Sequence, residues 1–278
     1  MRQAVHVTAV LAAGGMAVVA LTTSSNAQSV NDQSVQAANL SAARHAAAAA
    51  DDDHSDTVYV TSKAKDGTVS VTIYDPAKGV TPDQLRDKLR RSGVTGVLDK
   101  GQEPPTTQPN QKQGLLVACL SFGTAHQWCD RRWNYGGFRD PQVYFLDHTS
   151  SAWPVNAAVN VWNEAVGIDS YYRWYTAGCP SGRHCVNVYN GRYGINDWYG
   201  QTTWAPGTQG PVTVRLNDSY SLTANEHRTV TCHELGHALS LHHNTASGSC
   251  LKSGTYISLR PNIYDYELLK RIYPLSGT

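Results

Sequence analysis

Apolar and polar residues alternate between positions 57 and 74, and the tripeptide at 65–67, Lys-Asp-Gly, interrupts the alternation with a turn signal. A period of two residues is typical of half-buried strands, so this stretch predicts a β-hairpin. A helical pattern then begins at Pro82 and ends at Gly93. The sequence therefore predicts a small hairpin-plus-helix unit over residues 57–100.

After this unit, short strand patterns and helical patterns follow one another. A strand pattern covers 141–148, and a helical pattern, with apolar residues three and four positions apart, covers 154–166. Further strand patterns, separated by Gly, Pro, Asn or Asp, cover residues 168–176, 184–190, 200–204 and 211–217.

The first residues have the pattern of a targeting segment. Arg2 precedes an apolar run at 7–21, and small residues follow at 25–27. This pattern predicts a secretory signal peptide over residues 1–27. The alternative, a retained membrane anchor, needs about 20 apolar residues. We therefore expect a secreted, extracellular protein with no membrane partner once the signal peptide is removed.

Two further stretches have compositions that do not favour a packed structure. Residues 28–56 are rich in Ala, Ser, Asn, Gln and Asp, so we expect them to be disordered. Residues 101–114 are rich in Pro, Gln and Thr, which is typical of an extended linker. The main domain is therefore expected over residues 115–278.

Charge and cysteine content limit the partners and the compartment. The chain has 23 basic and 22 acidic residues, which excludes the broad basic surface that a phosphate backbone needs, so no nucleic-acid partner is expected. Secretion favours disulfides among the six cysteines. Pairing of nearest neighbours, one of many possible pairings, predicts the disulfides Cys119–Cys129, Cys179–Cys185 and Cys232–Cys250.

A capping-box pattern beginning at Thr223 predicts a helix over 224–241, and this helix contains the sequence His-Glu-Leu-Gly-His. His233 and His237 share one helix face, so both can reach one zinc ion. Glu234 can lean over the metal and accept a proton from a water molecule whose pKa the zinc lowers. The alternative is that these are solvated residues of an ordinary helix, but chance matches to this pattern are rare.

A third histidine, six residues after His237, completes the pattern H-E-x-x-H-x-x-x-x-x-H. His243 stands at that position, and the neighbouring His242 is its rival as a ligand. This segment resembles the zinc signature of the metzincin metallopeptidases, a group that includes the matrixins. The resemblance implies that His233, His237 and His243 bind catalytic zinc, and that Glu234 is the general base in peptide-bond hydrolysis.

The resemblance also has consequences for the fold. It implies an α+β domain with a mixed twisted sheet that has an antiparallel edge, a long zinc-binding helix and a C-terminal helix, expected here over 262–273. It further implies a secreted, monomeric zinc endopeptidase that acts on an extended peptide or protein substrate. The strand at 211–217 is then either the edge that aligns the substrate or an ordinary strand of the sheet.

The chain departs from the metzincin pattern at two positions. Ser240 stands where the family has Gly, and a left-handed conformation there costs about 1–2 kcal/mol unless the turn differs. Leu251 takes the place of a methionine below the zinc, with a volume close enough to keep the packing. A disulfide between Cys232 and Cys250 would tie the zinc helix to this floor.

By the same resemblance, residues 28–114 would be a pro-segment. No cysteine precedes Cys119, so the pro-segment cannot inhibit the enzyme by placing a thiolate on the zinc. It could inhibit through an Asp or His ligand, or through steric cover of the site by residues 57–100. Two other functions stay open, namely a secreted zinc-containing binding protein without turnover and a zinc hydrolase of a non-protein cell-wall substrate. Glu234 favours an enzyme, since a structural zinc site needs no base.

Overall fold

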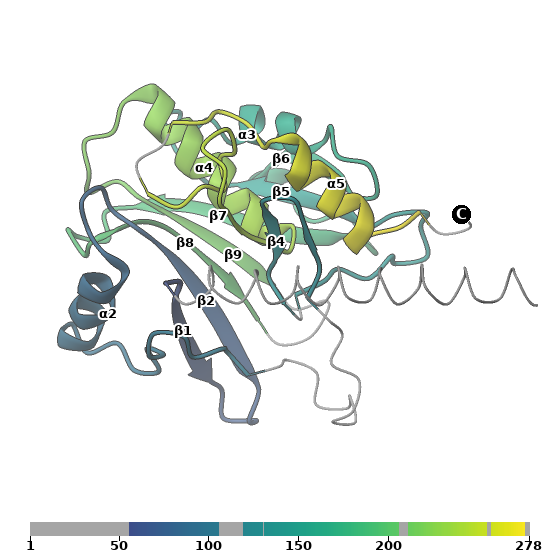
Figure 1. The fold of residues 1–278 in the computed structure, drawn as a ribbon. Helices are drawn as coiled ribbons and strands as arrows, with labels where there is room; N and C mark the ends of the chain where they lie inside the picture. Colours follow the sequence, from purple (N-terminus) through teal and green to yellow (C-terminus); the bar gives the residue numbers. More distant parts are fainter. Residues whose placement is uncertain (1–55, 106–118, 130, 206–210, 255–256, 276–278) are drawn as a thin grey trace, which may run out of the picture. The chain divides into compact units, whose positions relative to one another are not determined.

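The computed structural model describes residues 56–105, 119–129, 131–205, 211–254 and 257–275 (Figure 1). The predicted signal peptide, nearly all of the stretch predicted to be disordered and most of the predicted linker lie outside these residues. Among the helices of the described residues, none is long and apolar enough to cross a membrane.

The described residues form two sheets and four α-helices, and so belong to the α+β class. The larger sheet has the strand order β1-β2-β8-β9-β7-β5-β6. It is mixed, because β6, β5, β7 and β9 pair in parallel whereas β9, β8, β2 and β1 pair antiparallel. The bounds are β1 Val58–Lys63, β2 Val69–Pro76, β5 Gln142–Asp147, β6 Asp169–Trp174, β7 His184–Gly191, β8 Trp198–Trp204 and β9 Val212–Asn217.

Two helices cover one face of this sheet. Helix α3 (Val155–Trp162) packs against β6, and helix α4 (Ala224–Ala238) packs against α3, β8 and β9 (Figure 1). A single 3₁₀ turn, Tyr175–Ala177, follows β6. The second sheet lies beside helix α5 and has the order β10-β4-β3. The bounds of these elements are β3 Ser121–Phe122, β4 Ala125–Gln127, β10 Leu241–Asn244 and α5 Ile263–Ile272.

Most of the predicted elements are confirmed, including all three disulfides. All four helices end before the predicted residue, and the differences are largest for α3 and α4. Helix α3 stops at Trp162, because Asn163 uses its side chain to accept a hydrogen bond from the backbone N–H of Ser170 on β6. Helix α4 stops at Ala238, because Ser240 has a left-handed conformation with φ +80°, and β10 then begins at Leu241. Helical periodicity in the sequence reveals neither the hydrogen bond of Asn163 nor the conformation of Ser240.

The strand predicted at 211–217 is not an edge. It forms β9, which lies between β7 and β8, so its interpretation as an ordinary strand is correct and its interpretation as a substrate-aligning edge is wrong. The antiparallel strand outside it is β8. The second edge of β8 pairs with β2, so the N-terminal residues extend the main sheet.

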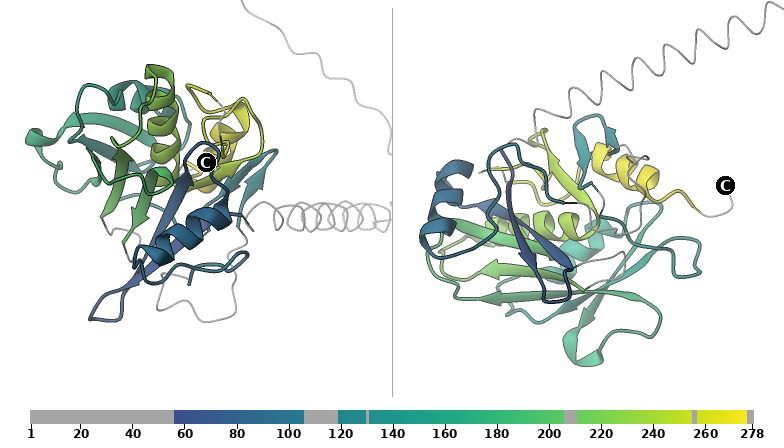
Figure 2. Two further views of the ribbon diagram at one scale, coloured as in Figure 1. Left: turned by 90° about the vertical axis from the view of Figure 1, so that its left-hand side faces the viewer. Right: turned by 90° about the horizontal axis from the view of Figure 1, so that it is seen from below.

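The N-terminal hairpin and helix form as predicted, as β1, β2 and helix α2 (Pro82–Arg91). Helix α2 lies beside β1 at this end of the sheet (Figure 2). The two faces of β2 have different neighbours. Val71 and Ile73 belong to the main core, whereas Tyr74 packs with Trp198 in a second core beneath α2. Because side chains alternate along a strand, Asp75 lies on the same face as Ile73, towards α4.

Candidate metal centre

Helix α4 carries the first two histidines. It begins with the predicted capping box, in which Thr223 Oγ1 accepts a hydrogen bond from the N–H of Glu226 and the Glu226 carboxylate accepts one from the N–H of Thr223. His233 and His237 follow one turn apart and are both buried. The helix therefore places two imidazoles on one face, as its sequence predicts.

The chain leaves α4 through a left-handed residue. Ser240 has φ +80°, the conformation for which glycine is usual. Its hydroxyl hydrogen-bonds with that of Tyr273, and its carbonyl oxygen accepts a hydrogen bond of 2.8 Å from the N–H of Trp128. These contacts hold the turn that leads into β10 and brings His243 back towards the helix.

Three histidines converge. One nitrogen atom from each of His233, His237 and His243 lies within 4.8 Å of the other two. The rival His242 is not in this group, since its Nε2 atom lies 2.8 Å from the hydroxyl oxygen of Tyr59 on β1. The structure thus brings together the three residues predicted as ligands and directs His242 elsewhere.

Backbone carbonyl groups set the tautomers of two of these histidines. Nδ1 of His233 donates a hydrogen bond to the carbonyl oxygen of Cys250, and Nδ1 of His237 donates one to that of Leu241, each at 2.9 Å. Since a carbonyl oxygen only accepts, each Nδ1 carries the proton and each Nε2 keeps a lone pair. Burial and the neighbouring His233 hold the pKa of His237 well below its usual value, so its ring stays neutral.

Glu234 is completely buried beside the histidines. Its Oε2 atom accepts a hydrogen bond of 2.6 Å from Thr202 on β8, and its Oε1 atom has no hydrogen-bond partner. Burial and the neighbouring Asp75 carboxyl group raise the pKa of Glu234 well above its usual value, although the Thr202 bond opposes this shift. Burial thus disfavours the charged form of this carboxyl group when no cation is present.

Asp75 on β2 is a site residue that the sequence did not single out. Its Oδ1 atom is buried without a hydrogen-bond partner and lies 3.9 Å from Nε2 of His233. Asp75, His233 and Glu234 form a second convergent group. Burial raises the pKa of Asp75, and His233 opposes this shift. One expectation from the sequence is an Asp or His from residues 28–114 near the metal site, but the sequence does not say which one. Strand pairing shows that Asp75 is the residue that lies there.

Residues 250 and 251 form the floor of the site. The Cys232–Cys250 disulfide ties them to α4. Leu251 is fully buried against Gly236 of α4, where an added Cβ atom would lie 2.7 Å from Cδ2 of Leu251. The carbonyl oxygen of Leu251 accepts a hydrogen bond from the N–H of Asn244 in β10. This floor therefore holds both segments that carry the histidines.

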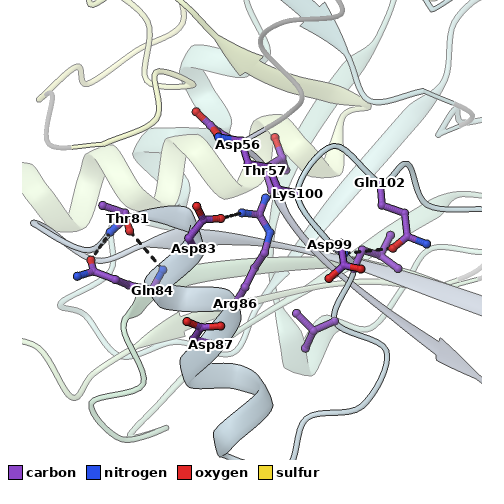
Figure 3. Close-up of polar contacts among 12 residues, drawn as sticks. Asp56, Thr57, Thr81, Asp83, Gln84, Arg86, Asp87, Asp99, Lys100 and Gln102 are labelled. Atoms are coloured by element: carbon purple, nitrogen blue, oxygen red, sulfur yellow. Dashed lines mark hydrogen bonds and ion pairs between the residues drawn. The ribbon is translucent and has the colours of Figure 1, made fainter.

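Helix α2 holds the start of β1 against the histidine cluster. The buried Arg86 side chain donates a hydrogen bond of 2.7 Å to the carbonyl oxygen of Thr57, and it pairs with Asp83 (Figure 3). The hydroxyl oxygen of Thr57 lies 3.1 Å from Nε2 of His242 and 3.5 Å from Nδ1 of His243. The N-terminal unit therefore reaches the cluster from β1 as well as from β2.

Two pockets of different size border the histidines. The pocket bordered by His233 and Asp75 has a volume of about 30 Å³, room for water but not for a peptide. A pocket of about 300 Å³ borders His243, and Tyr74 and Pro76 of β2 line it as well. The N-terminal unit therefore contributes to the walls on both sides.

No protein-family model matches this chain, and no curated protein matches it. The assignment therefore rests on the chemistry of the site. The Nε2 atoms of His233 and His237 face each other at 2.9 Å, and both carry lone pairs, so the arrangement is repulsive unless a cation binds them. Together with the partnerless oxygens of Asp75 and Glu234, these donors fit a divalent metal ion.

Proposed function

We propose that the chain is a secreted, monomeric zinc-dependent endopeptidase with a metzincin-like, matrixin-related catalytic domain. One observation supports this above all others: three buried histidines converge, and Glu234 lies beside them. Imidazole donors suit zinc better than magnesium or calcium. A carboxylate next to the ligands is the base that catalytic zinc sites use and structural sites do not need.

Each residue has a defined task in this proposal. Zinc, when bound, polarises the scissile carbonyl group and makes water more acidic. His233, His237 and His243 would hold the metal. Glu234 would take the proton of the attacking water through its Oε1 atom, which has no hydrogen-bond partner, and pass it to the leaving amine. Thr202 orients the carboxyl group by binding Oε2.

The outer edge of β8 is the surface that we assign to the substrate. Gly200 and Thr202 of this strand contact Glu234, so a chain paired with β8 passes the general base. β2 already pairs with this edge in the antiparallel direction. An extended peptide can add to the edge by the same backbone hydrogen bonds. These bonds do not depend on the side chains of the peptide, so they do not restrict its sequence.

Residues 28–114 are the pro-segment in this proposal, which makes the intact chain a zymogen. Its β2 strand occupies the substrate edge, so a peptide cannot pair there until β2 leaves. Secretion accords with the three disulfides, which persist in oxidising compartments.

The test is a chelation and rescue experiment on the full-length secreted chain. Hydrolysis of a quenched mixed-peptide library is measured before and after limited proteolysis within 106–118, and bound zinc is counted in parallel. We expect one zinc per chain, and hydrolysis that follows removal of the N-terminal segment, stops with chelator and returns with zinc. Glu234→Gln should keep zinc but hydrolyse peptides several orders of magnitude more slowly. Glu164→Gln, at an exposed position, is the control and should keep both the zinc and the rate of hydrolysis.

The alternatives predict other outcomes. Bound zinc without any hydrolysis favours the binding protein, which one observation supports: Asp75 adds a fourth donor in the intact chain, as in closed structural sites. Hydrolysis of cell-wall material but not of peptides favours the cell-wall hydrolase.

A further inference from the structure

We infer that a cavity beside β7 binds the C-terminal carboxylate of a peptide. This cavity, called the Arg183 cavity below, has a volume of about 510 Å³, and Arg183, His184 and Asn187 are among the residues that line it. None of its described lining residues belongs to the histidine cluster of the candidate metal centre. The inference therefore does not depend on the proposed zinc site.

The polar side chains of the Arg183 cavity lie on the face of the main sheet opposite to α3 and α4. Val186 and Val188 of β7 point into the core that these helices cover. Because side chains alternate along a strand, Cys185 and Asn187 point to the other face. Leu146 of β5 pairs with Asn187 and lines the cavity as well. The sheet therefore lies between these side chains and α4.

The guanidinium group of Arg183 is held in place without an anionic partner. Its Cζ atom lies 3.7 Å from the centre of the Phe138 ring. A guanidinium group stacked on a ring keeps the N–H groups in its plane available for a carboxylate. Within the described residues its side chain forms no hydrogen bond or ion pair, and no acidic residue among them lines the cavity. The charge of the cavity thus favours an anion.

The loop that carries Arg183 is short and crosslinked. The disulfide between Cys179 and Cys185 closes it over six positions. Inside the loop, the backbone N–H of Arg183 donates a hydrogen bond to the carbonyl oxygen of Pro180. A loop restrained in this way loses little conformational entropy when it binds a ligand. Arg183 is therefore preorganised for binding.

His184 and Asn187 supply an acceptor and a donor. Nε2 of His184 lies 2.7 Å from the carbonyl oxygen of Asn134, so Nε2 carries the proton and Nδ1 keeps a lone pair. Burial lowers the pKa of His184, which favours this neutral ring. Oδ1 of Asn187 accepts a hydrogen bond of 3.1 Å from Nε2 of His148, which leaves the amide N–H groups of Asn187 for a ligand.

These groups match the end of a peptide chain. The terminal carboxylate would accept hydrogen bonds from Arg183 and Asn187, and the last backbone N–H would donate one to Nδ1 of His184. Trp133 and Leu146 also line the cavity and give it apolar walls for the last side chain. A sugar acid shares the carboxylate but not the apolar side chain. The free carboxylate is thus the group that recognition requires.

The test is a calorimetric titration of the full-length chain with the peptide acetyl-Ala-Ala-Leu, and with the same peptide ending in an amide. We expect the acid to bind at least about tenfold more tightly than the amide, because only the acid forms charge-assisted hydrogen bonds. Both titrations are repeated in EDTA, which should leave the affinities unchanged.

Arg183→Gln should bind the acid at least about tenfold more weakly than the parent and the amide about equally well. Arg192→Gln is the matched control, since Arg192 is exposed and does not line the cavity. It should bind both peptides as the parent does. The melting temperatures of the variants show whether each one is folded.

Asn187→Asp covers the case in which Arg183→Gln disturbs the loop through its contact with Phe138. The new side chain keeps the oxygen that accepts from His148, and it adds a negative charge beside the proposed carboxylate. We expect it to lose the preference for the acid over the amide. Affinity for the acid equal to that of the parent in both variants overturns the inference.

Three further outcomes contradict the inference. Equal affinity of the parent for the acid and the amide, or no binding of either, shows that the cavity does not recognise a carboxylate. Binding of the acid that disappears in EDTA shows that a metal holds the carboxylate. Binding of glucuronate in place of the peptide acid assigns the cavity to a sugar acid.

Discussion

Gly200 on β8 lies against the carboxyl group of Glu234 on α4: a Cβ atom added to Gly200 would come within 2.7 Å of Cδ of Glu234. The hydroxyl oxygen of Thr202 lies 2.6 Å from Oε2 and 3.0 Å from the backbone carbonyl oxygen of the same glutamate. The strand that we propose for substrate binding therefore also determines the orientation of the proposed general base.

Gly200→Ala should displace the Glu234 carboxyl group, because the added methyl group has no other space. We expect loss of most hydrolytic activity of the processed protein with zinc content unchanged, measured by peptide hydrolysis and metal analysis. Gly248→Ala is the matched control, since nothing lies within 4 Å of its added Cβ. Full activity in Gly200→Ala would show that Glu234 does not depend on this contact.

Ser240→Gly and Ser240→Ala should differ by about 1–2 kcal/mol in the free energy of unfolding, in favour of glycine. Both lose the hydroxyl contact with Tyr273, so the difference isolates the cost of φ +80°. Urea unfolding measures it, and Tyr273→Phe reports the hydroxyl contact separately. Equal stability of the two variants would mean that the turn relaxes when the side chain is shortened.

Leu251→Met should change the free energy of unfolding by less than about 1.5 kcal/mol, since the two side chains have similar volumes. Leu251→Ala should cost about 2–5 kcal/mol, because Leu251 is fully buried against Gly236. Urea unfolding measures both, and a competing chelator measures zinc affinity, which we expect to fall only in the alanine variant. A similar cost for both variants would contradict a simple packing role.

The metal-free chain should lose stability as pH rises, because burial and Asp75 raise the pKa of Glu234 in the folded state. Such a group contributes stability that is fully present below its unfolded pKa and is lost as pH rises through the folded pKa. In EDTA, Glu234→Gln should therefore match the parent below about pH 4.5 and become increasingly more stable above it. Urea unfolding between pH 4 and 8 measures this, and a difference independent of pH would contradict it.

The sequence by itself determined the local features of this protein. Pairing of nearest neighbours predicts the disulfides, whose cysteines lie 6 to 18 positions apart. The spacing of His233 and His237, the capping box at Thr223 and the hairpin turn at 65–67 involve residues only a few positions apart. Patterns of this length follow from helix and strand geometry alone. The role of the histidines as zinc ligands stays a prediction.

Contacts between distant residues were decided only by the tertiary structure. The alternation in β2 does not show which strand it joins, yet its pairing with β8 brings Asp75 to His233. Gly200 and Thr202, which contact Glu234, likewise lie on β8 and not on β9. The position of His243, rather than His242, beside His233 and His237 likewise depends on Ser240 and on the contact of His242 with Tyr59. A shift of one residue in the register of β2 would turn Asp75 to the opposite face of the sheet. Packing between residues far apart in the sequence prevents such a shift, and no local sequence pattern records that packing.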